Sequence, residues 1–156
     1  MKSKLSIIFF FFISISSFCQ TSVKEKNAIK GTWQVGTNEV SSTNHDTYTF
    51  IENNKFEFKP TGYNGLNRIV KISGTYKIED NEIIFNIKTV TELIGGKIER
   101  SMITTLSDSW AIDGGKLVSK KVNGTEQKAT FNFCKSEDGN QNCIEIDNRR
   151  YFKVTE

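Results

Sequence analysis

The sequence predicts an all-β protein, an antiparallel up-and-down meander that closes into a β-barrel of about eight to ten strands. Glycines and asparagines separate short runs of β-branched and aromatic residues at intervals of about ten residues, which is typical of a barrel or sandwich. No stretch of about a dozen residues repeats its apolar positions at helical spacing. A long meander leaves two unpaired edges, and we expect closure because it removes both.

The chain opens with the pattern of a secretory signal peptide, residues 1–19. Two lysines precede an apolar run that ends at Ile15, and small residues lead to Cys19. The run is shorter than the about 20 residues of a membrane-spanning helix. Cleavage after Cys19 leaves residues 20–156 as one domain. The alternative is lipid attachment at Cys19, which the bulky Phe18 disfavours because a lipobox has a small residue there.

Charge gives no reason to expect a polyanionic partner. The full chain carries a formal net charge of +3, and the leader contributes two of its lysines and no acidic residue, so the mature chain carries +1. Basic residues are scattered among the strands, and we expect no binding to nucleic acid. No second long apolar segment follows the leader, so no membrane span is expected. The expected location is periplasmic or extracellular, and the sequence does not identify a protein partner.

Turn signals divide the mature chain into ten expected strands, linked mostly by tight turns. We expect one longer polar link, residues 37–45, to cross an open end of the barrel. The expected strands are 29–36, 46–52, 55–60, 68–79, 82–94, 97–106, 109–112, 116–122, 125–135 and 142–154.

Two hairpins bring aromatic side chains to one face. A two-residue loop at Asp80–Asn81 fixes one register. An odd loop over 52–54, with an asparagine in the left-handed conformation, fixes the other, since a two-residue loop would turn aromatics to both faces. A closed barrel then turns four aromatic side chains inward as candidate ligand contacts: Phe56, Phe58, Tyr76 and Phe85.

Asn123–Gly124 is the strongest hairpin signal in the chain, because both loop residues of a type I′ turn need positive φ. It predicts a reversal between the strands at 116–122 and 125–135, with Lys121 opposite Glu126.

Counting outward from a turn at Asp138–Gly139 places Cys134 directly opposite Cys143. Two cysteines in an exported chain predict a disulfide. A metal site would need further ligands at close spacing, and the sole histidine, His45, is far away in sequence. We therefore expect no metal and no cofactor.

The opening strand at 28–36 contains Gly31-Thr32-Trp33, which resembles the Gly-x-Trp motif of the lipocalin and calycin barrels. The later hairpins resemble the small bacterial lipocalin-like proteins over most of the mature chain. The resemblance implies that Trp33 closes one end of the barrel under a cation from the last strand, Arg149 or Arg150. The alternative is an ordinary core tryptophan. The second lipocalin motif and the helix after the eighth strand are missing from the sequence.

The expected function is that of an exported binding module for a small apolar or amphipathic ligand. The alternative is a protein-interaction domain, of inhibitor or immunity type, with a barrel filled by side chains. A hollow or a filled interior separates the two. An enzyme is not expected, because His45 lies in a polar run and the sequence pairs no nucleophile with a base.

Overall fold

A computed structural model describes most of residues 20–156. The described residues are 28–36, 45–62, 65–100, 110–135, 139 and 142–154. The predicted signal peptide, most of the polar link 37–45 and the turn residue Asp138 lie outside them. Within these ranges no helix has the length and apolar character needed to cross a membrane.

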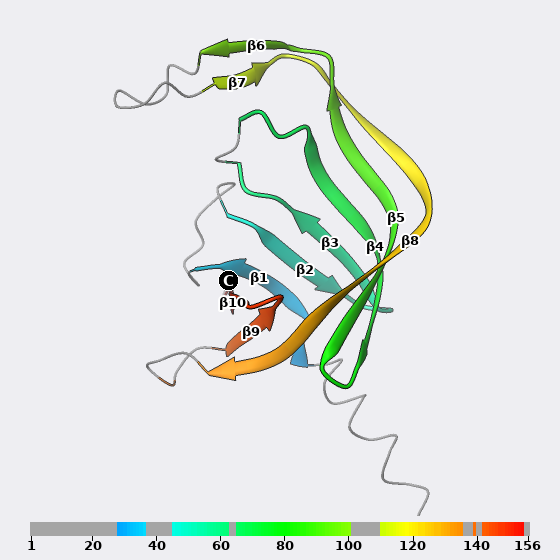
Figure 1. Ribbon diagram of the computed structural model, residues 1–156, viewed down its shortest axis with the longest axis vertical. Helices are drawn as coiled ribbons and strands as arrows, with labels where there is room; N and C mark the ends of the chain where they lie inside the picture. Colours follow the sequence, from blue (N-terminus) through cyan, green and yellow to red (C-terminus); the bar gives the residue numbers. More distant parts are fainter. Residues whose placement is uncertain are drawn as a thin grey trace, which may run out of the picture.

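Ten β-strands follow one another along the described chain (Figure 1). They are β1 (Gly31–Val35), β2 (Thr47–Ile51), β3 (Lys55–Lys59), β4 (Ile69–Glu79), β5 (Glu82–Ile94), β6 (Lys97–Arg100), β7 (Trp110–Asp113), β8 (Lys116–Lys135), β9 (Asn142–Ile146) and β10 (Arg149–Lys153). Eight of them form a closed antiparallel barrel in the order β1-β10-β9-β8-β5-β4-β3-β2, while β6 and β7 form a separate sheet. The predicted all-β meander that closes into a barrel is confirmed.

The two aromatic hairpins have the predicted register. Asn53 and Asn54 take φ values of 58° and 55° in the loop over 52–54, and Phe50 lies opposite Phe56. Other predicted pairs also form: Tyr48 with Phe58, Tyr76 with Phe85, and Ile78 with Ile83. Local turn chemistry therefore sets the inward face of this half of the barrel.

The hairpin predicted at Asn123–Gly124 is wrong, because β8 runs unbroken through it and pairs with β5 on both sides. Lys121 lies opposite Thr89 and Thr125 opposite Ile87, so three residues of β8 face the single Lys88. Gly124 keeps a positive φ of 57°. A bulge uses the same left-handed conformation that a tight turn needs.

The strand predicted over 142–154 is divided by a hairpin that was not predicted. Asp147 and Asn148 have φ values of 48° and 62°, and Ile146 lies opposite Arg149. Positive φ at both loop residues is the signature of a type I′ turn. The turn creates β10, which closes the barrel by pairing with β1.

The cysteine register is as predicted. Cys134 on β8 lies directly opposite Cys143 on β9, with a Cα–Cα distance of 4.9 Å and the two sulfurs within disulfide distance. This pair joins two neighbouring strands of the barrel wall, and it is consistent with an oxidising compartment.

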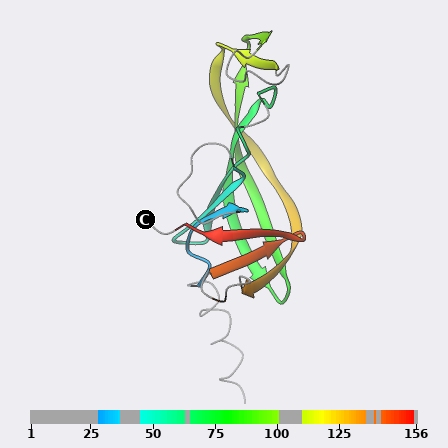
Figure 2. The ribbon, with the colours of Figure 1, turned by 90° about the vertical axis from the view of Figure 1, so that its left-hand side faces the viewer.

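The strands β5 and β8 continue beyond the barrel as a curved ribbon that carries β6 and β7 at its end (Figures 1 and 2). We call this extension the arm and define it as residues 65–71, 88–100 and 110–124. The Ile112 N–H donates a hydrogen bond of 2.9 Å to the Gly65 carbonyl, and Arg68 Nη1 donates to the Leu93 and Gly95 carbonyls at 3.1 and 2.9 Å. These bonds tie the β6–β7 sheet and the ribbon to the segment that precedes β4.

Candidate functional site

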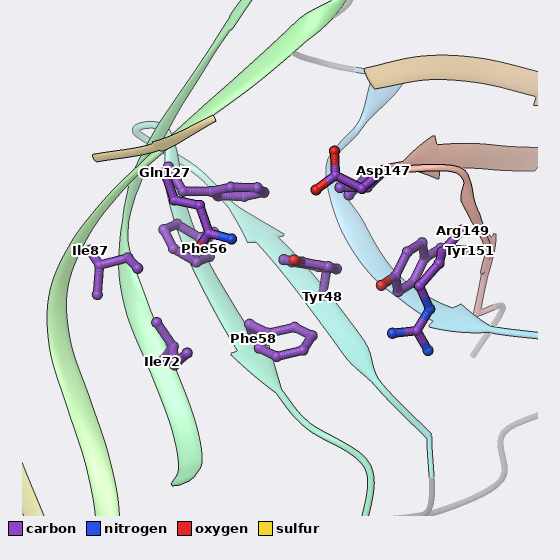
Figure 3. A pocket seen from close by; sticks show the side chains of 11 residues that line it. Tyr48, Phe56, Phe58, Ile72, Ile87, Gln127, Asp147, Arg149 and Tyr151 are labelled. Carbon is purple, nitrogen blue, oxygen red and sulfur yellow. The ribbon is translucent and has the colours of Figure 1, made fainter. Parts of the chain in front are cut away.

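A cavity of about 300 Å³ opens within the barrel. Strands β2, β3, β4, β5, β8, β9 and β10 and the Asp147–Asn148 turn supply its lining. The lining residues are Tyr48, Phe56, Phe58, Ile72, Phe85, Ile87, Gln127, Ile146, Asp147, Arg149 and Tyr151. Figure 3 shows Ile72 and Ile87 on one side of this space and Tyr151 and Arg149 on the other. The interior is thus hollow in part, with a mostly apolar wall.

Aromatic rings in mutual contact form much of the wall, with Tyr48 in their middle. Its ring centroid lies 4.6 Å from that of Phe58, 5.4 Å from that of Phe85 and 5.3 Å from that of Tyr151. Phe56 adds a further contact with Phe85 at 4.7 Å. These separations are typical of favourable aromatic pairs, so the rings hold one another in place around the cavity.

Three polar or charged side chains interrupt the apolar wall: Gln127, Asp147 and Arg149. Arg149 Nη1 lies 2.6 Å from Oδ2 of Asp46, which is 7% exposed. The Thr130 N–H donates a hydrogen bond of 2.9 Å to Oδ1 of Asp147. Both ionic groups at the cavity therefore have partners within the protein.

The two tyrosines of the wall are held in their neutral form. Burial raises the pKa of Tyr48 far above its usual value, and nearby Tyr151, Asp147 and Asp46 act in the same direction, whereas Arg149 lowers it. Burial is also the main cause that raises the pKa of Tyr151. At ordinary pH both side chains are phenols that can donate a hydrogen bond.

Three of the four predicted ligand contacts, Phe56, Phe58 and Phe85, line the cavity. The fourth, Tyr76, is absent from the lining and lies in the core, 4% exposed, with its ring 4.9 Å from that of Phe50. Alternation along the strand correctly turns Tyr76 inward. It gives no information on depth along the barrel axis, so the sequence did not distinguish Tyr76 from the three residues that line the cavity. A ligand contact at Tyr76 stays a prediction.

Several lining residues were not predicted from the sequence. Tyr48 could have been predicted, because the predicted register already places it opposite Phe58. Tyr151 and Arg149 depend on the Asp147–Asn148 turn, which lacks the glycine of the common hairpin signals. Because this turn was not predicted, the lining residues on that side of the cavity could not be predicted either.

Trp33 is 1% exposed, and its Nε1–H donates a hydrogen bond of 2.6 Å to the Ile29 carbonyl. The cation over its ring is Lys153, with Nζ 5.4 Å from the ring centroid, which corrects the prediction of Arg149 or Arg150. The reason is register, since Lys153 lies directly opposite Trp33.

The two arginines have other neighbours. Arg149 lies over Tyr151, with the guanidinium carbon 6.0 Å from the ring centroid. Arg150, on the opposite face of the strand by alternation, lies 3.8 Å from a Glu145 carboxylate oxygen. The role of Trp33 in closing one end of the barrel stays a prediction.

The fold and the cavity together define a class, a closed eight-stranded antiparallel barrel consistent with a lipocalin-like fold. Comparisons with protein-family models, with curated proteins and with solved structures found no match to this chain. In the part of the chain that the structure describes, no three His, Cys, Asp or Glu side chains gather where they could hold a metal ion.

Proposed function

We propose that this protein is an exported binding module that takes up a small apolar or amphipathic molecule in the barrel cavity. The observation that carries the proposal is the aromatic-lined cavity of about 300 Å³ inside the closed barrel. This volume lies at the lower end of the range of ligand sites, about 300–1,000 Å³. It equals the space of about ten water molecules, so the ligand is small.

The wall chemistry favours a flat or flexible ligand without net charge. Tyr48, Phe58 and Phe85 line the cavity with aromatic rings, which an apolar ligand can contact. Arg149 is already paired with Asp46, and Asp147 already accepts a hydrogen bond, so a charged ligand would have to compete with partners in place. The phenol groups of Tyr48 and Tyr151, together with Gln127, would orient one polar end.

Titration with N-phenylnaphthylamine, an uncharged dye whose fluorescence rises in apolar surroundings, tests the proposal. We expect saturable binding of one dye per chain. Phe58→Ala and Phe85→Ala each remove a ring from the wall, and we expect each to weaken binding about tenfold, which corresponds to about 1.4 kcal/mol of lost contact.

Phe131→Ala is the matched control. Phe131 is 3% exposed, as Phe85 is, but it does not line the cavity. It should lower stability as the Phe85 variant does and leave dye affinity unchanged. A second variant, Ile72→Trp, fills the cavity from β4 and should abolish binding in a folded protein. Absence of saturable binding to the wild type, or equal losses in the Phe85 and Phe131 variants, would refute the proposal and favour the interaction-domain alternative.

A further inference from the structure

The exposed apolar surface of the described chain is concentrated on the arm. Nine large apolar side chains are exposed in the described ranges, and two of them, Ile51 and Phe133, lie on the barrel. The other seven lie on the arm: Leu66, Ile69, Val70, Ile94, Ile98, Trp110 and Leu117. An exposed apolar region of this kind marks an interaction site.

Positive charge is concentrated on the same extension. The arm carries eight lysines and arginines against three acidic residues, a formal net charge of +5. The remaining described residues carry nine of each sign and are neutral in sum. The near-neutral charge of the mature chain therefore conceals a strongly basic arm beside a neutral barrel, and the partner of the arm should be anionic.

The end of the arm combines both properties on one face. In the β6–β7 sheet, Trp110 lies opposite Arg100 and Ile98 lies opposite Ile112. Alternation places all four side chains on the same face. Trp110 is 53% exposed and Ile98 is 60% exposed. Tryptophan and arginine beside aliphatic side chains are the composition of protein surfaces that lie at a membrane interface.

The ribbon that leads to the β6–β7 sheet exposes apolar side chains on both faces. Leu117 lies opposite Leu93, and the next pair joins Ile94 to Lys116. Neighbouring residues of a strand point to opposite faces, so the exposed Leu117 and Ile94 lie on different sides of the ribbon. A flat protein partner would cover one side only. The headgroup region of a bilayer can surround a narrow ribbon on both sides.

We propose that the arm docks onto the surface of an anionic phospholipid bilayer. Its exposed apolar side chains enter the boundary between headgroups and acyl chains, and its lysines and arginines approach the lipid phosphates. The inference rests on the arm alone and is independent of what the cavity binds.

The two tryptophans allow a direct test in the mature protein. Trp33 is 1% exposed in the core, whereas Trp110 is 53% exposed on the arm, so any change in fluorescence reports Trp110. With vesicles of phosphatidylcholine and phosphatidylglycerol in equal parts, we expect a blue shift, weaker quenching by acrylamide and co-sedimentation. Pure phosphatidylcholine vesicles should bind at least about tenfold more weakly, and added salt should weaken binding to the mixed vesicles.

Arm variants identify the surface. We expect Ile98→Ser combined with Leu117→Ser to weaken binding more than about tenfold, since each side chain loses its burial in the interface. Lys116→Gln should weaken it about fivefold through the lost charge. Ile51→Ser is the matched control, because Ile51 is an apolar residue 41% exposed on the barrel, and binding should not change.

Three results would overturn the proposal: no binding to anionic vesicles, equal binding to neutral ones, or binding indifferent to the arm substitutions. An acidic protein that binds the arm in the absence of any vesicle binding would replace the bilayer with a protein partner. Phe58→Ala, which alters the cavity, should leave vesicle binding unchanged.

Discussion

Replacing Asp46 should lower the free energy of unfolding, because its side chain links the segment after β3 to the closing strand β10. The Asp46 carbonyl accepts a hydrogen bond of 3.1 Å from Val35 N–H, and its Oδ1 accepts one of 2.7 Å from Thr61 N–H. Its Oδ2 lies 2.6 Å from Arg149 Nη1 on β10. One side chain that is 11% exposed thus joins the chain after β3 to the strand that closes the barrel.

The magnitude follows from what each variant leaves behind. Asp46→Ala leaves the Thr61 N–H without its acceptor, at about 1–3 kcal/mol. It also removes the ion pair, worth about 0–1 kcal/mol because the Arg149 side chain is 54% exposed and screened by solvent. The total is about 1–4 kcal/mol. Asp46→Asn keeps an oxygen for Thr61 and loses only the charge, so it should cost about 1 kcal/mol or less.

Urea denaturation of a chain that comprises residues 20–156 measures both variants. At an m-value of about 2 kcal/mol/M, the alanine variant should lower the midpoint by about 0.5–2 M and the asparagine variant by less than about 0.5 M. Arg149→Gln serves as the partner variant, and the double variant with Asp46→Asn should couple by less than about 1 kcal/mol. Equal losses for alanine and asparagine would refute the reasoning, because they would assign the stability to the charge.

Three further predictions test other parts of the structure. Trp33→Ala should cost about 3–5 kcal/mol in urea unfolding, as large core truncations do, and a loss below about 1 kcal/mol would contradict a core role. Because the folded pKa values of Tyr48 and Tyr151 are raised, stability should be constant below pH 10 and fall above it, by up to about 1.4 kcal/mol per pH unit for each tyrosine; unfolding free energies that stay level from pH 9 to 11 would argue against it. Mass spectrometry of non-reduced peptides should find Cys134 joined to Cys143, and reduction should cost about 2–3 kcal/mol; two free thiols would disprove the pairing.

The sequence was most informative where a short loop and a strict alternation agree. The loop over 52–54 and the turn at Asp80–Asn81 each fix a register, and alternation then identifies the inward side chains. Phe56, Phe58 and Phe85 follow from the sequence in this way. The depth of Tyr76 does not, because depth depends on how the strands stagger around the barrel, a property of the closed sheet and not of one hairpin.

The other side of the cavity depended on a turn with weak local signal. Asp147–Asn148 adopts positive φ at two residues that each have a side chain, at a cost that only Asn and Asp tolerate well. The strand pairings that the turn makes possible stabilise it, since β10 pairs with β9 on one edge and with β1 on the other. The hairpin ladder with β9 and the ladder with the distant strand β1 together offset a modest local strain. The contribution of β1 cannot be read from the residues next to the turn.

Asn123–Gly124 is the opposite case. Its sequence is a strong hairpin signal, but the pairing of β8 with β5 makes it a bulge. Two observations favour glycine at position 124: φ is 57°, and a Cβ there would lie 3.1 Å from the Asn86 Oδ1, a tight contact. A reversal at this point would separate the strand before it from β5. Instead β8 keeps its pairing with β5 past the bulge, as far as Lys116 opposite Ile94. The bulge therefore lies where the barrel ends and the arm begins. Gly124 suggested a hairpin in the sequence, but in the structure it lets β8 continue through the bulge. The bulge marks the boundary between the neutral barrel with its cavity and the basic arm with its exposed apolar side chains.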